Sequence, residues 1–128
     1  MTTENIPKDL LYSKDHEWIK LDGDLATIGI THHAQSELGD IVYVELPEID
    51  DEISEGDTIG TIEAVKTVAD IYAPLSGTVV DVNAELEDDS TCMNTSPYED
   101  GWIAVIKINS NTYPTDLLTS EQYLKLIE

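Results

Sequence analysis

The sequence is poor in several residue types, and each shortage excludes a class of protein. It has no phenylalanine, and its single cysteine, Cys92, rules out an intrachain disulfide and fits a reducing compartment. The basic residues are six lysines against 27 acidic residues, which gives a formal net charge of −21. So strong an acidic balance disfavours binding to nucleic acid or anionic membranes and favours docking on basic partner surfaces.

The sequence also shows no pattern typical of a targeting peptide, a membrane-spanning segment or a catalytic motif. No apolar run is long enough to span a membrane, and Met1–Pro7 has the features of neither a secretory signal nor a transit peptide, so we expect a cytoplasmic location. His16, His32 and His33 lack the helical spacing and the cysteine neighbours of a zinc site, so we predict no metal centre. With no nucleophile–base pair and no phosphate-binding glycine loop, we expect a non-catalytic protein.

The length and the apolar pattern predict one small β-rich domain. The 128 residues, 41% of them hydrophobic, predict a single domain over 1–128, with an N-terminal extension at 1–10 and a helical tail at 115–128. Apolar runs bounded by turn residues predict strands at 16–21, 25–30, 41–46, 58–63, 68–73, 78–83 and 102–108. A short helix is predicted at Thr31–Leu38, closed by Gly39, and Thr119 with Gln122 forms a capping box for the tail helix. Strands at this spacing indicate an all-β sandwich or barrel.

A weak internal repeat indicates how the strands are arranged. Residues 39–45 (Gly-Asp-Ile-Val-Tyr-Val-Glu) are similar to residues 77–83 (Gly-Thr-Val-Val-Asp-Val-Asn), and residues 56–62 are similar to residues 101–107. Each unit would contain two strands on either side of a polar loop. Two such units would intertwine into a flattened sandwich with a rough two-fold axis and a hairpin at one end.

Lys66 is the most informative residue, because it lies between two predicted strands that are close enough to require a hairpin. The connection, about Ala64–Thr67, has none of the Gly, Asn or Asp residues that tight turns normally use. Nearby carboxylates such as Glu63 favour the charged ammonium, which argues against a catalytic or Schiff-base lysine. The pattern is typical of a lysine that a dedicated enzyme acylates.

Eight short motifs, in order over nearly the whole chain, form a specific set. They are Asp15-His16-Glu17-Trp18, Ala26–Thr31, Ala34-Gln35, Leu38–Val42, Val44–Pro47, Glu63-Ala64-Val65-Lys66, Pro74–Gly77 and Ser96–Trp102. Together they resemble the H-protein family of the glycine cleavage system. The family commonly has Glu-Ser-Val-Lys-Ala where this chain has Glu-Ala-Val-Lys-Thr, and Asp88–Thr95 is looser than the usual pattern. Neither change removes a chemical group that the role requires.

The resemblance implies an all-β, flattened barrel–sandwich hybrid of the biotinyl and lipoyl type, with a short helix and a C-terminal helix. It implies that Lys66 carries lipoic acid in amide linkage, with Glu63, Val65 and Thr67 completing the attachment site. The carrier would take the aminomethyl group of glycine from a pyridoxal-phosphate-dependent decarboxylase to a tetrahydrofolate-dependent aminomethyltransferase. Its reduced arm would go to dihydrolipoamide dehydrogenase. A lipoate ligase or a lipoyl or octanoyl transferase would attach the arm, and we expect a monomer.

The cargo of such an arm poses a physical problem that points to two further residues. A protonated aminomethyl group on sulfur is cationic and labile in water, so a carrier could protect it by folding the arm against its own acidic side chains. Glu17, in the His-Glu-Trp strand, and Asp70, just beyond the lysine, are our candidates for this protection. We expect their replacement by amides to shorten the lifetime of the loaded form.

Other interpretations of the lysine hairpin stay open on sequence grounds. Biotinyl domains typically have Met on both sides of the lysine, and lipoyl domains of 2-oxoacid dehydrogenases typically have Asp-Lys-Ala, whereas the neighbours here are Val65 and Thr67. An H-like protein that donates lipoate to other carriers is a further alternative. So is an unmodified acidic interaction module in which Lys66 is only a contact residue.

Overall fold

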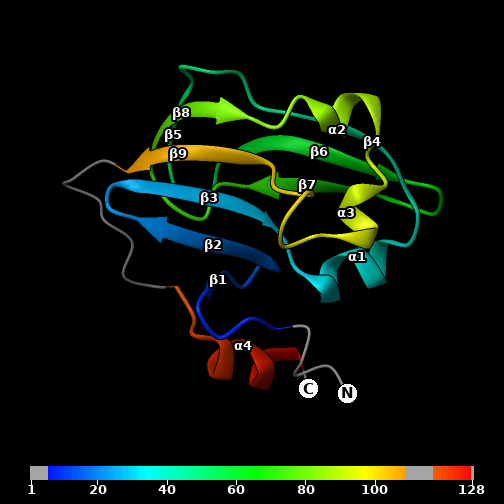
Figure 1. Cartoon of the computed structure of the whole chain (residues 1–128), viewed down its shortest axis with the longest axis horizontal. Coiled ribbons are helices and arrows are strands. Elements are labelled where there is room, and N and C mark those ends of the chain that lie inside the picture. Colours follow the sequence, from blue (N-terminus) through cyan, green and yellow to red (C-terminus); the bar gives the residue numbers. More distant parts are fainter. Residues whose placement is uncertain (1–5, 109–116, 128) are drawn as a thin grey trace.

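The computed structural model describes residues 6–108 and 117–127, which form two antiparallel sheets and four helices (Figure 1). The larger sheet has the strand order β1 (Leu11–Tyr12), β2 (Glu17–Asp22), β3 (Leu25–Ile30), β9 (Ala104–Ile108), β8 (Gly77–Val82) and β5 (Glu52–Ile53). The smaller sheet has the order β4 (Ile41–Glu45), β6 (Thr58–Ala64) and β7 (Val68–Tyr72). The helices are α1 (His32–Leu38), α2 (Glu85–Asp88), α3 (Cys92–Thr95) and α4 (Ser120–Ile127). The predicted extension 1–10 and tail 115–128 each fall partly outside the described residues.

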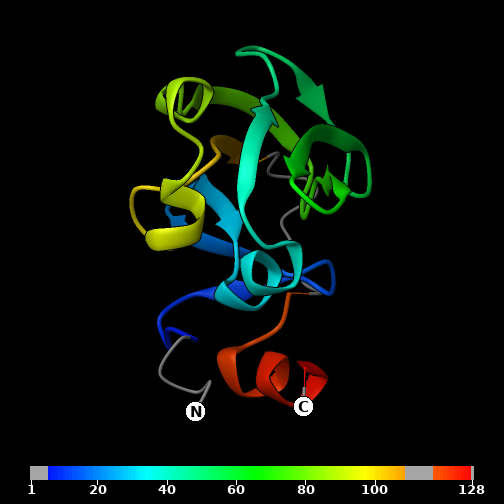
Figure 2. The same cartoon turned by 90° about the vertical axis from the view of Figure 1, so that its right-hand side faces the viewer.

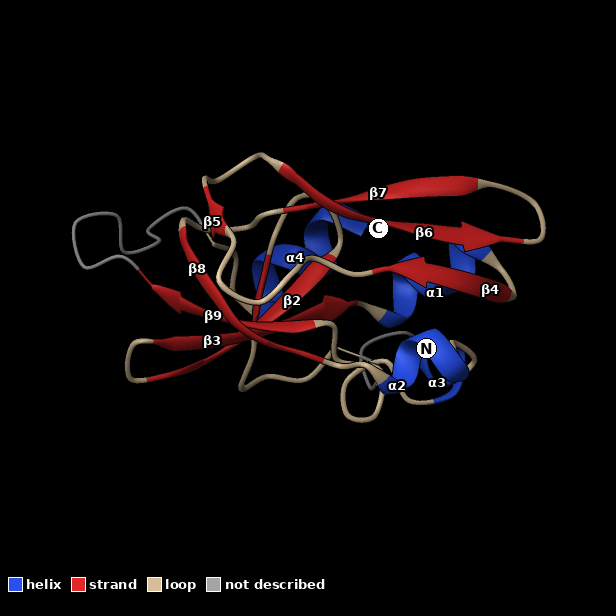
Figure 3. Cartoon of the chain, turned by 90° about the horizontal axis from the view of Figure 1, so that it is seen from above, coloured by secondary structure: helices blue, strands red, loops and turns tan. Residues whose placement is uncertain are grey.

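The two sheets pack against each other and enclose the main core, as the view from above shows (Figure 3). The core is built mainly from isoleucine and other aliphatic side chains, as expected for a chain without phenylalanine. Ile28, Ile62 and Ile106, one from each of three strands, are almost fully buried, and each such burial stabilises the fold by about 1.5–3 kcal/mol. The predicted β-sandwich with short helices is confirmed. Over the described residues both sheets are open, so no closed barrel forms.

A second, smaller core attaches α4 to β1 and β2. Its buried members are Ile6, Leu10, Tyr12, Trp18 and Tyr123. The rings of Tyr12 and Tyr123 stack with their centroids 4.8 Å apart. Backbone hydrogen bonds of 2.8 and 2.7 Å join Tyr12 to Leu118, just ahead of α4. The C-terminal helix is therefore fastened to the edge of the larger sheet.

The internal repeat corresponds to two similar strand pairs, β4 with β6 and β8 with β9, both antiparallel. Each pair has a register shift, and the two shifts lie at matched positions of the repeat, between Ile41 and Tyr43 and between Val79 and Asp81. Val44 pairs with Ile62, and its equivalent in the second unit, Val82, pairs with Ala104. Residue 62 therefore corresponds to residue 104 and not to residue 107, so the predicted match of 56–62 with 101–107 is out of register. The units also differ in their outer neighbour, because β6 continues to β7 while β9 pairs with β3.

The predicted helix ends are confirmed at the level of single hydrogen bonds. Thr31 Oγ1 accepts from Ala34 N at 3.1 Å at the start of α1, and Gly39 ends that helix with a φ of 80°. Thr119 N donates to Gln122 Oε1 at 2.9 Å, and Gln122 N donates to Thr119 Oγ1 at 3.3 Å, which is the capping box ahead of α4. Among the described residues no helix has the length and apolar character needed to cross a membrane.

Four short elements, β1, β5, α2 and α3, are not predicted from the sequence. Helices α2 and α3 lie in the segment 84–101, for which the sequence analysis predicts neither a helix nor a strand. Elements of this length contain too little of a helical or strand period to show in a sequence. Contacts with other segments define them instead, as when β5 pairs with β8.

Candidate functional site

Lys66 lies at the tip of the hairpin that joins β6 to β7, at one end of the sandwich (Figure 3). The connection is Val65–Thr67, slightly shorter than the sequence predicts, and all of its residues are exposed. The same end of the molecule carries α1, α2 and α3, which Figure 2 shows face on. The structure therefore presents Lys66 to solvent with helices as its neighbours.

The hairpin tip turns without glycine and is held in place by backbone hydrogen bonds. Ala64 N donates to the carbonyl oxygen of Thr67 at 2.8 Å, and Val65 N donates to the carbonyl oxygen of Asp40 at 3.0 Å. None of residues 64–67, all of which the structure describes, has a positive φ, so the turn needs no Gly, Asn or Asp. The bond to Asp40 fastens the tip to the segment between α1 and β4.

That segment is held in turn by the side chain of Asn94, on α3. Its Oδ1 accepts from Ile41 N at 3.0 Å, and its Nδ2 donates to Gln35 Oε1 at 3.0 Å and to the carbonyl oxygen of Gly39 at 2.8 Å. A Cβ placed on Gly39 would lie 3.9 Å from Cε of Lys66. The stem of Lys66 therefore runs beside the C-terminal end of α1, at a place that α3 fixes.

A cavity of about 200 Å³, here called the α1 pocket, lies between β2, α1 and β7. Its acidic lining residues are Asp15, Glu17, Glu37 and Asp70, and its apolar ones include Ile30, Leu38 and Ile71. Glu17 and Asp70, the two residues that we propose from the sequence as protectors of the cargo, thus line the same cavity. The mixed lining suits a group that is apolar along its length and cationic at its end.

Glu17 is the buried carboxyl group of the α1 pocket, with 2% of its surface exposed. Its Oε2 accepts from Tyr72 N at 2.9 Å, and its Oε1 accepts from Ser13 Oγ at 3.2 Å. Burial raises the pKa of Glu17 from 4.5 to about 8, and these hydrogen bonds only partly oppose that rise. The carboxyl group is therefore mainly protonated at neutral pH, and a cation placed beside it would favour its ionised form.

Asp70 lines the same pocket but is exposed, so it lies at the part that faces solvent. It is on β7, where it pairs with Thr61 of β6. A carboxylate in water attracts a cation less strongly than a buried one, because solvent and salt screen it. We expect Asp70 to contribute less than Glu17 to holding a cation.

Two histidines to which the sequence assigns structural or surface roles also line the pocket. The ring centroids of His16 and His33 are 4.8 Å apart. Burial lowers the pKa of His16, and His33 lowers it further, so His16 is neutral at neutral pH. Within the described ranges, no cluster of three or more His, Cys, Asp or Glu side chains could hold a metal ion. Both rings form part of the pocket lining.

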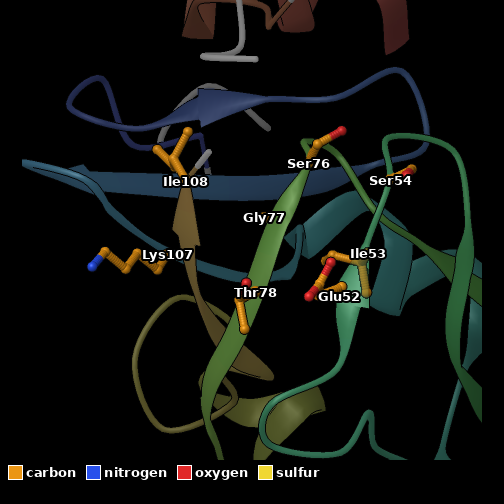
Figure 4. Close-up of a pocket in the computed structure, with 8 residues that line it drawn as sticks. All are labelled: Glu52, Ile53, Ser54, Ser76, Gly77, Thr78, Lys107 and Ile108. Carbon is orange, nitrogen blue, oxygen red and sulfur yellow. The ribbon is translucent and has the colours of Figure 1, made fainter. Parts of the chain in front are cut away.

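A larger cavity, of about 570 Å³, lies at the other end of the sandwich between β5, β8 and β9 (Figure 4). Its polar side chains come from Glu52, Ser54, Ser76, Thr78 and Lys107. In Figure 4, Glu52 and Lys107 lie on opposite sides of β8 and do not point toward each other. Both are exposed, so this cavity holds no buried titratable group of the kind that Glu17 provides. We therefore take the smaller α1 pocket as the candidate site.

Comparison with known protein families gives a match over nearly the whole chain. Residues 10–128 match the family described as Glycine cleavage H-protein. The glycine cleavage system H protein of Staphylococcus haemolyticus is 54% identical over 122 residues, a match that covers 95% of this chain and 97% of that protein. The protein of the same name from Staphylococcus epidermidis is 53% identical over 122 residues, with the same coverage of 95% and 97%.

Comparison with solved structures agrees with the sequence comparisons. The crystal structure of a glycine cleavage system H protein from Mycobacterium marinum superposes with a TM-score of 0.87 at 39% sequence identity. The match covers 94% of this chain and 97% of that one. The fold as a whole therefore has a close counterpart among solved structures.

Proposed function

The chain belongs to the glycine cleavage H-protein family, and from this membership we propose that Lys66 is the residue on which it carries a covalent lipoyl group. The chain is a non-catalytic carrier component of the glycine cleavage system, and the other components of that system are its partners. One observation carries the assignment to Lys66. It is the exposed position of this lysine at the tip of a fastened hairpin, beside the C-terminal end of α1.

The residues around Lys66 fit an attached lipoyl arm. The exposed side chain is accessible to an acylating enzyme, and amide formation there leaves no buried charge behind. Glu63, Val65 and Thr67 complete the attachment site, and Glu63 lies between Tyr43 and Val68 across the small sheet. When bound, a lipoyl group supplies a disulfide that opens to take an aminomethyl cargo on sulfur. The stem of Lys66, beside the end of α1, would direct the arm toward the wall that α1 contributes to the pocket.

We assign the α1 pocket to the protection of the amine cargo. Ile30, Leu38 and Ile71 would exclude water from the apolar part of the arm. Glu17 would meet the cationic end, and the cation would lower the pKa of its carboxyl group from about 8 and convert it to a carboxylate. Asp70 would add a weaker, solvent-screened attraction. The residues of the pocket neither form nor break a covalent bond. They hold the arm and shield its cargo from water.

Partner enzymes have to approach the end of the molecule that carries the hairpin. Apolar side chains are exposed there, namely Val42 at 58%, Tyr43 at 46%, Val65 at 72% and Val68 at 60%. Such a group of apolar side chains provides contact area, and the large negative charge steers basic surfaces toward it. The proposed partners are the pyridoxal-phosphate decarboxylase, the tetrahydrofolate aminomethyltransferase, dihydrolipoamide dehydrogenase and a lipoylating enzyme. The monomeric state and the cytoplasmic location stay predictions.

The experiment that tests this function is the mass of the intact protein from cells supplied with lipoate, followed by mapping of any increment by peptide sequencing. We expect a lipoyl increment on Lys66. A biotinyl increment would assign the chain to another carrier class. A lipoyl increment on a different lysine would overturn the site.

A further inference from the structure

The C-terminal helix α4 places one side chain, Tyr123, against His16, a lining residue of the α1 pocket. This residue is fully buried and stacks on Tyr12. Its hydroxyl oxygen lies 2.9 Å from Nδ1 of His16 and 2.7 Å from Oγ1 of Thr31. One hydroxyl group thus joins α4 to two separate segments of the protein.

The two groups that Tyr123 joins belong to two walls of the pocket. His16 lines the pocket and directly precedes Glu17. Thr31 caps α1 through Ala34 N, and α1 supplies the adjoining wall. A hydroxyl group outside the pocket lining therefore adds to the backbone bonds that hold these two walls together.

His16 needs such support, because its backbone lies in the left-handed region with a φ of 66°. A residue other than glycine keeps this conformation only where its surroundings hold it. Backbone hydrogen bonds provide part of the hold, from His16 N to Ser13 O at 3.2 Å and from Thr31 N to His16 O at 3.1 Å. The Tyr123 hydroxyl holds the imidazole ring itself.

The contacts of this network allow an arrangement of protons in which each group has a partner. Ala34 N donates to Thr31 Oγ1, Thr31 donates to the oxygen of Tyr123, and Tyr123 donates to Nδ1 of neutral His16. The other titratable groups that face His16 are Asp15 beside it and His33 and Glu37 on α1. The donation from Tyr123 favours neutral His16, in the same direction as burial and His33.

We infer that Tyr123 is a positioning residue of the α1 pocket, through which the C-terminal helix sets how long the pocket protects its cargo. The inference rests on the proposed function of that pocket. It gives α4 a role in the carrier cycle, beyond covering the edge of the larger sheet.

Two matched variants separate this role from simple stability. Tyr123→Phe removes the hydroxyl and keeps the stacked ring. Tyr12→Phe removes a hydroxyl from the partner ring of the same stack, where it donates to the carbonyl oxygen of Pro7, a residue outside the pocket lining. Tyr123→Phe loses two hydrogen bonds, to His16 and Thr31, and Tyr12→Phe loses one, to Pro7. Both changes keep the stacked rings, and only the first removes bonds to residues of the pocket walls.

The first measurement uses the full-length protein without cargo and follows the ring protons of His16 by NMR as the pH is changed. In Y123F we expect the pKa of His16 to rise, because the donor to its neutral form is lost. In Y12F we expect the pKa to stay at the wild-type value. An unchanged value in Y123F, or an equal rise in both variants, would overturn the inference.

The second measurement is the lifetime of the loaded arm on the lipoylated protein, loaded with formaldehyde and an ammonium salt after reduction so that no partner enzyme takes part. Decay is followed by intact mass. We expect Y123F to shorten the lifetime about two- to tenfold, the population change that one net hydrogen bond supports, and Y12F to leave it unchanged. Equal lifetimes in Y123F and wild type would overturn the inference and leave the proposed function standing.

A lipoyl-lysine peptide loaded in the same way shows whether the pocket protects at all. If wild-type protein loses its cargo as fast as the peptide, the protective function fails and the inference fails with it. If Y123F does not melt cooperatively, Thr31→Val cuts the same link from its other end. Thr31→Ser, which keeps the hydroxyl, is then its control and should retain the wild-type lifetime.

Discussion

The hairpin tip exposes Lys66 to solvent, whereas the buried part of the α1 pocket, here called its floor, encloses Glu17. Lys66 is exposed on a connection that two backbone hydrogen bonds hold in place. Glu17 is 2% exposed and bonded to Tyr72 and Ser13. Attachment of an arm requires access by other proteins, whereas protection of a labile cargo requires the exclusion of water. The fold meets both requirements by separating them along α1, whose end lies beside the lysine and whose face lines the pocket.

The two regions also differ in what a substitution should do. At the tip, side chains contact little, so a change there alters chemistry and leaves stability nearly unchanged. At the pocket floor, the charge state of Glu17 is part of the folding free energy, because burial disfavours its ionised form. Variants in the two regions should therefore separate function from stability.

The largest effect is expected at the tip. Lys66→Arg keeps the charge but cannot form the amide, so we expect complete loss of the lipoyl increment and of carrier function. Because the hairpin tip is outside the core, the melting temperature should stay within about 2 °C of the wild type. Intact mass and circular dichroism measure both. Lys20→Arg, at another exposed lysine, is the control and should keep the increment. Loss of cooperative melting in K66R would contradict the placement of this residue.

The next effect is a pH dependence at the pocket floor. Folding raises the pKa of Glu17 from 4.5 to about 8, so between these values the folded protein keeps a proton that the unfolded chain releases. The stabilisation is complete below this window and is lost as the pH rises through it, at about 1.4 kcal/mol per pH unit. Urea unfolding at pH 5 to 8 should show wild type losing stability relative to Glu17→Gln. A constant difference between the two proteins would contradict the raised pKa.

A smaller effect is expected where the two regions meet. Asn94→Ala removes three hydrogen bonds that hold the end of α1 and the start of β4. We expect the free energy of unfolding to fall by about 1–3 kcal/mol, because buried backbone groups lose their partners. Asn94→Asp keeps the acceptor for Ile41 N and should lose less. Chemical denaturation of the three proteins tests this order, and equal stabilities would show that α3 does not support the site.

The smallest effect should distinguish the two carboxyl groups of the pocket. Glu17→Gln removes the buried one, and we expect the lifetime of the loaded form to shorten about tenfold. Asp70→Asn removes an exposed one, and solvent screening limits its effect to about twofold. The decay of the loaded protein, followed by mass, gives both values. The reverse order would mean that the cargo lies at the solvent-facing part of the pocket and away from Glu17.

Local patterns in the sequence account for most of the fold. The strand pattern, the Thr31 cap of α1 and the capping box of α4 all depend on neighbouring residues, so the sequence predicts them well. The short helices α2 and α3 are not visible in the sequence, because their positions depend on contacts such as those of Asn94 with Gly39 and Ile41. Periodicity cannot show a bond between segments that lie far apart in the chain.

The candidate site divides in the same way. Lys66 is visible because its context is local, and Glu17 and Asp70 follow from the chemistry of the cargo that the family resemblance implies. The burial of Glu17 could not be read from the sequence, because it depends on how β2, β7 and α1 pack. His16 directly precedes Glu17, and this neighbour relation in the sequence could have indicated that His16 lies near the pocket. Nothing in the sequence places the Tyr123 hydroxyl against the His16 ring.

The central claim is that an arm attached to exposed Lys66 delivers its cationic end to buried Glu17. The most direct test is the pH titration of the Glu17 side-chain carboxyl carbon by NMR, on lipoylated protein with and without the aminomethyl cargo. The account predicts a pKa near 8 without cargo and a clearly lower pKa with it, because the cation favours the carboxylate. An identical titration in both states would contradict the claim, since the cargo would then not reach the pocket.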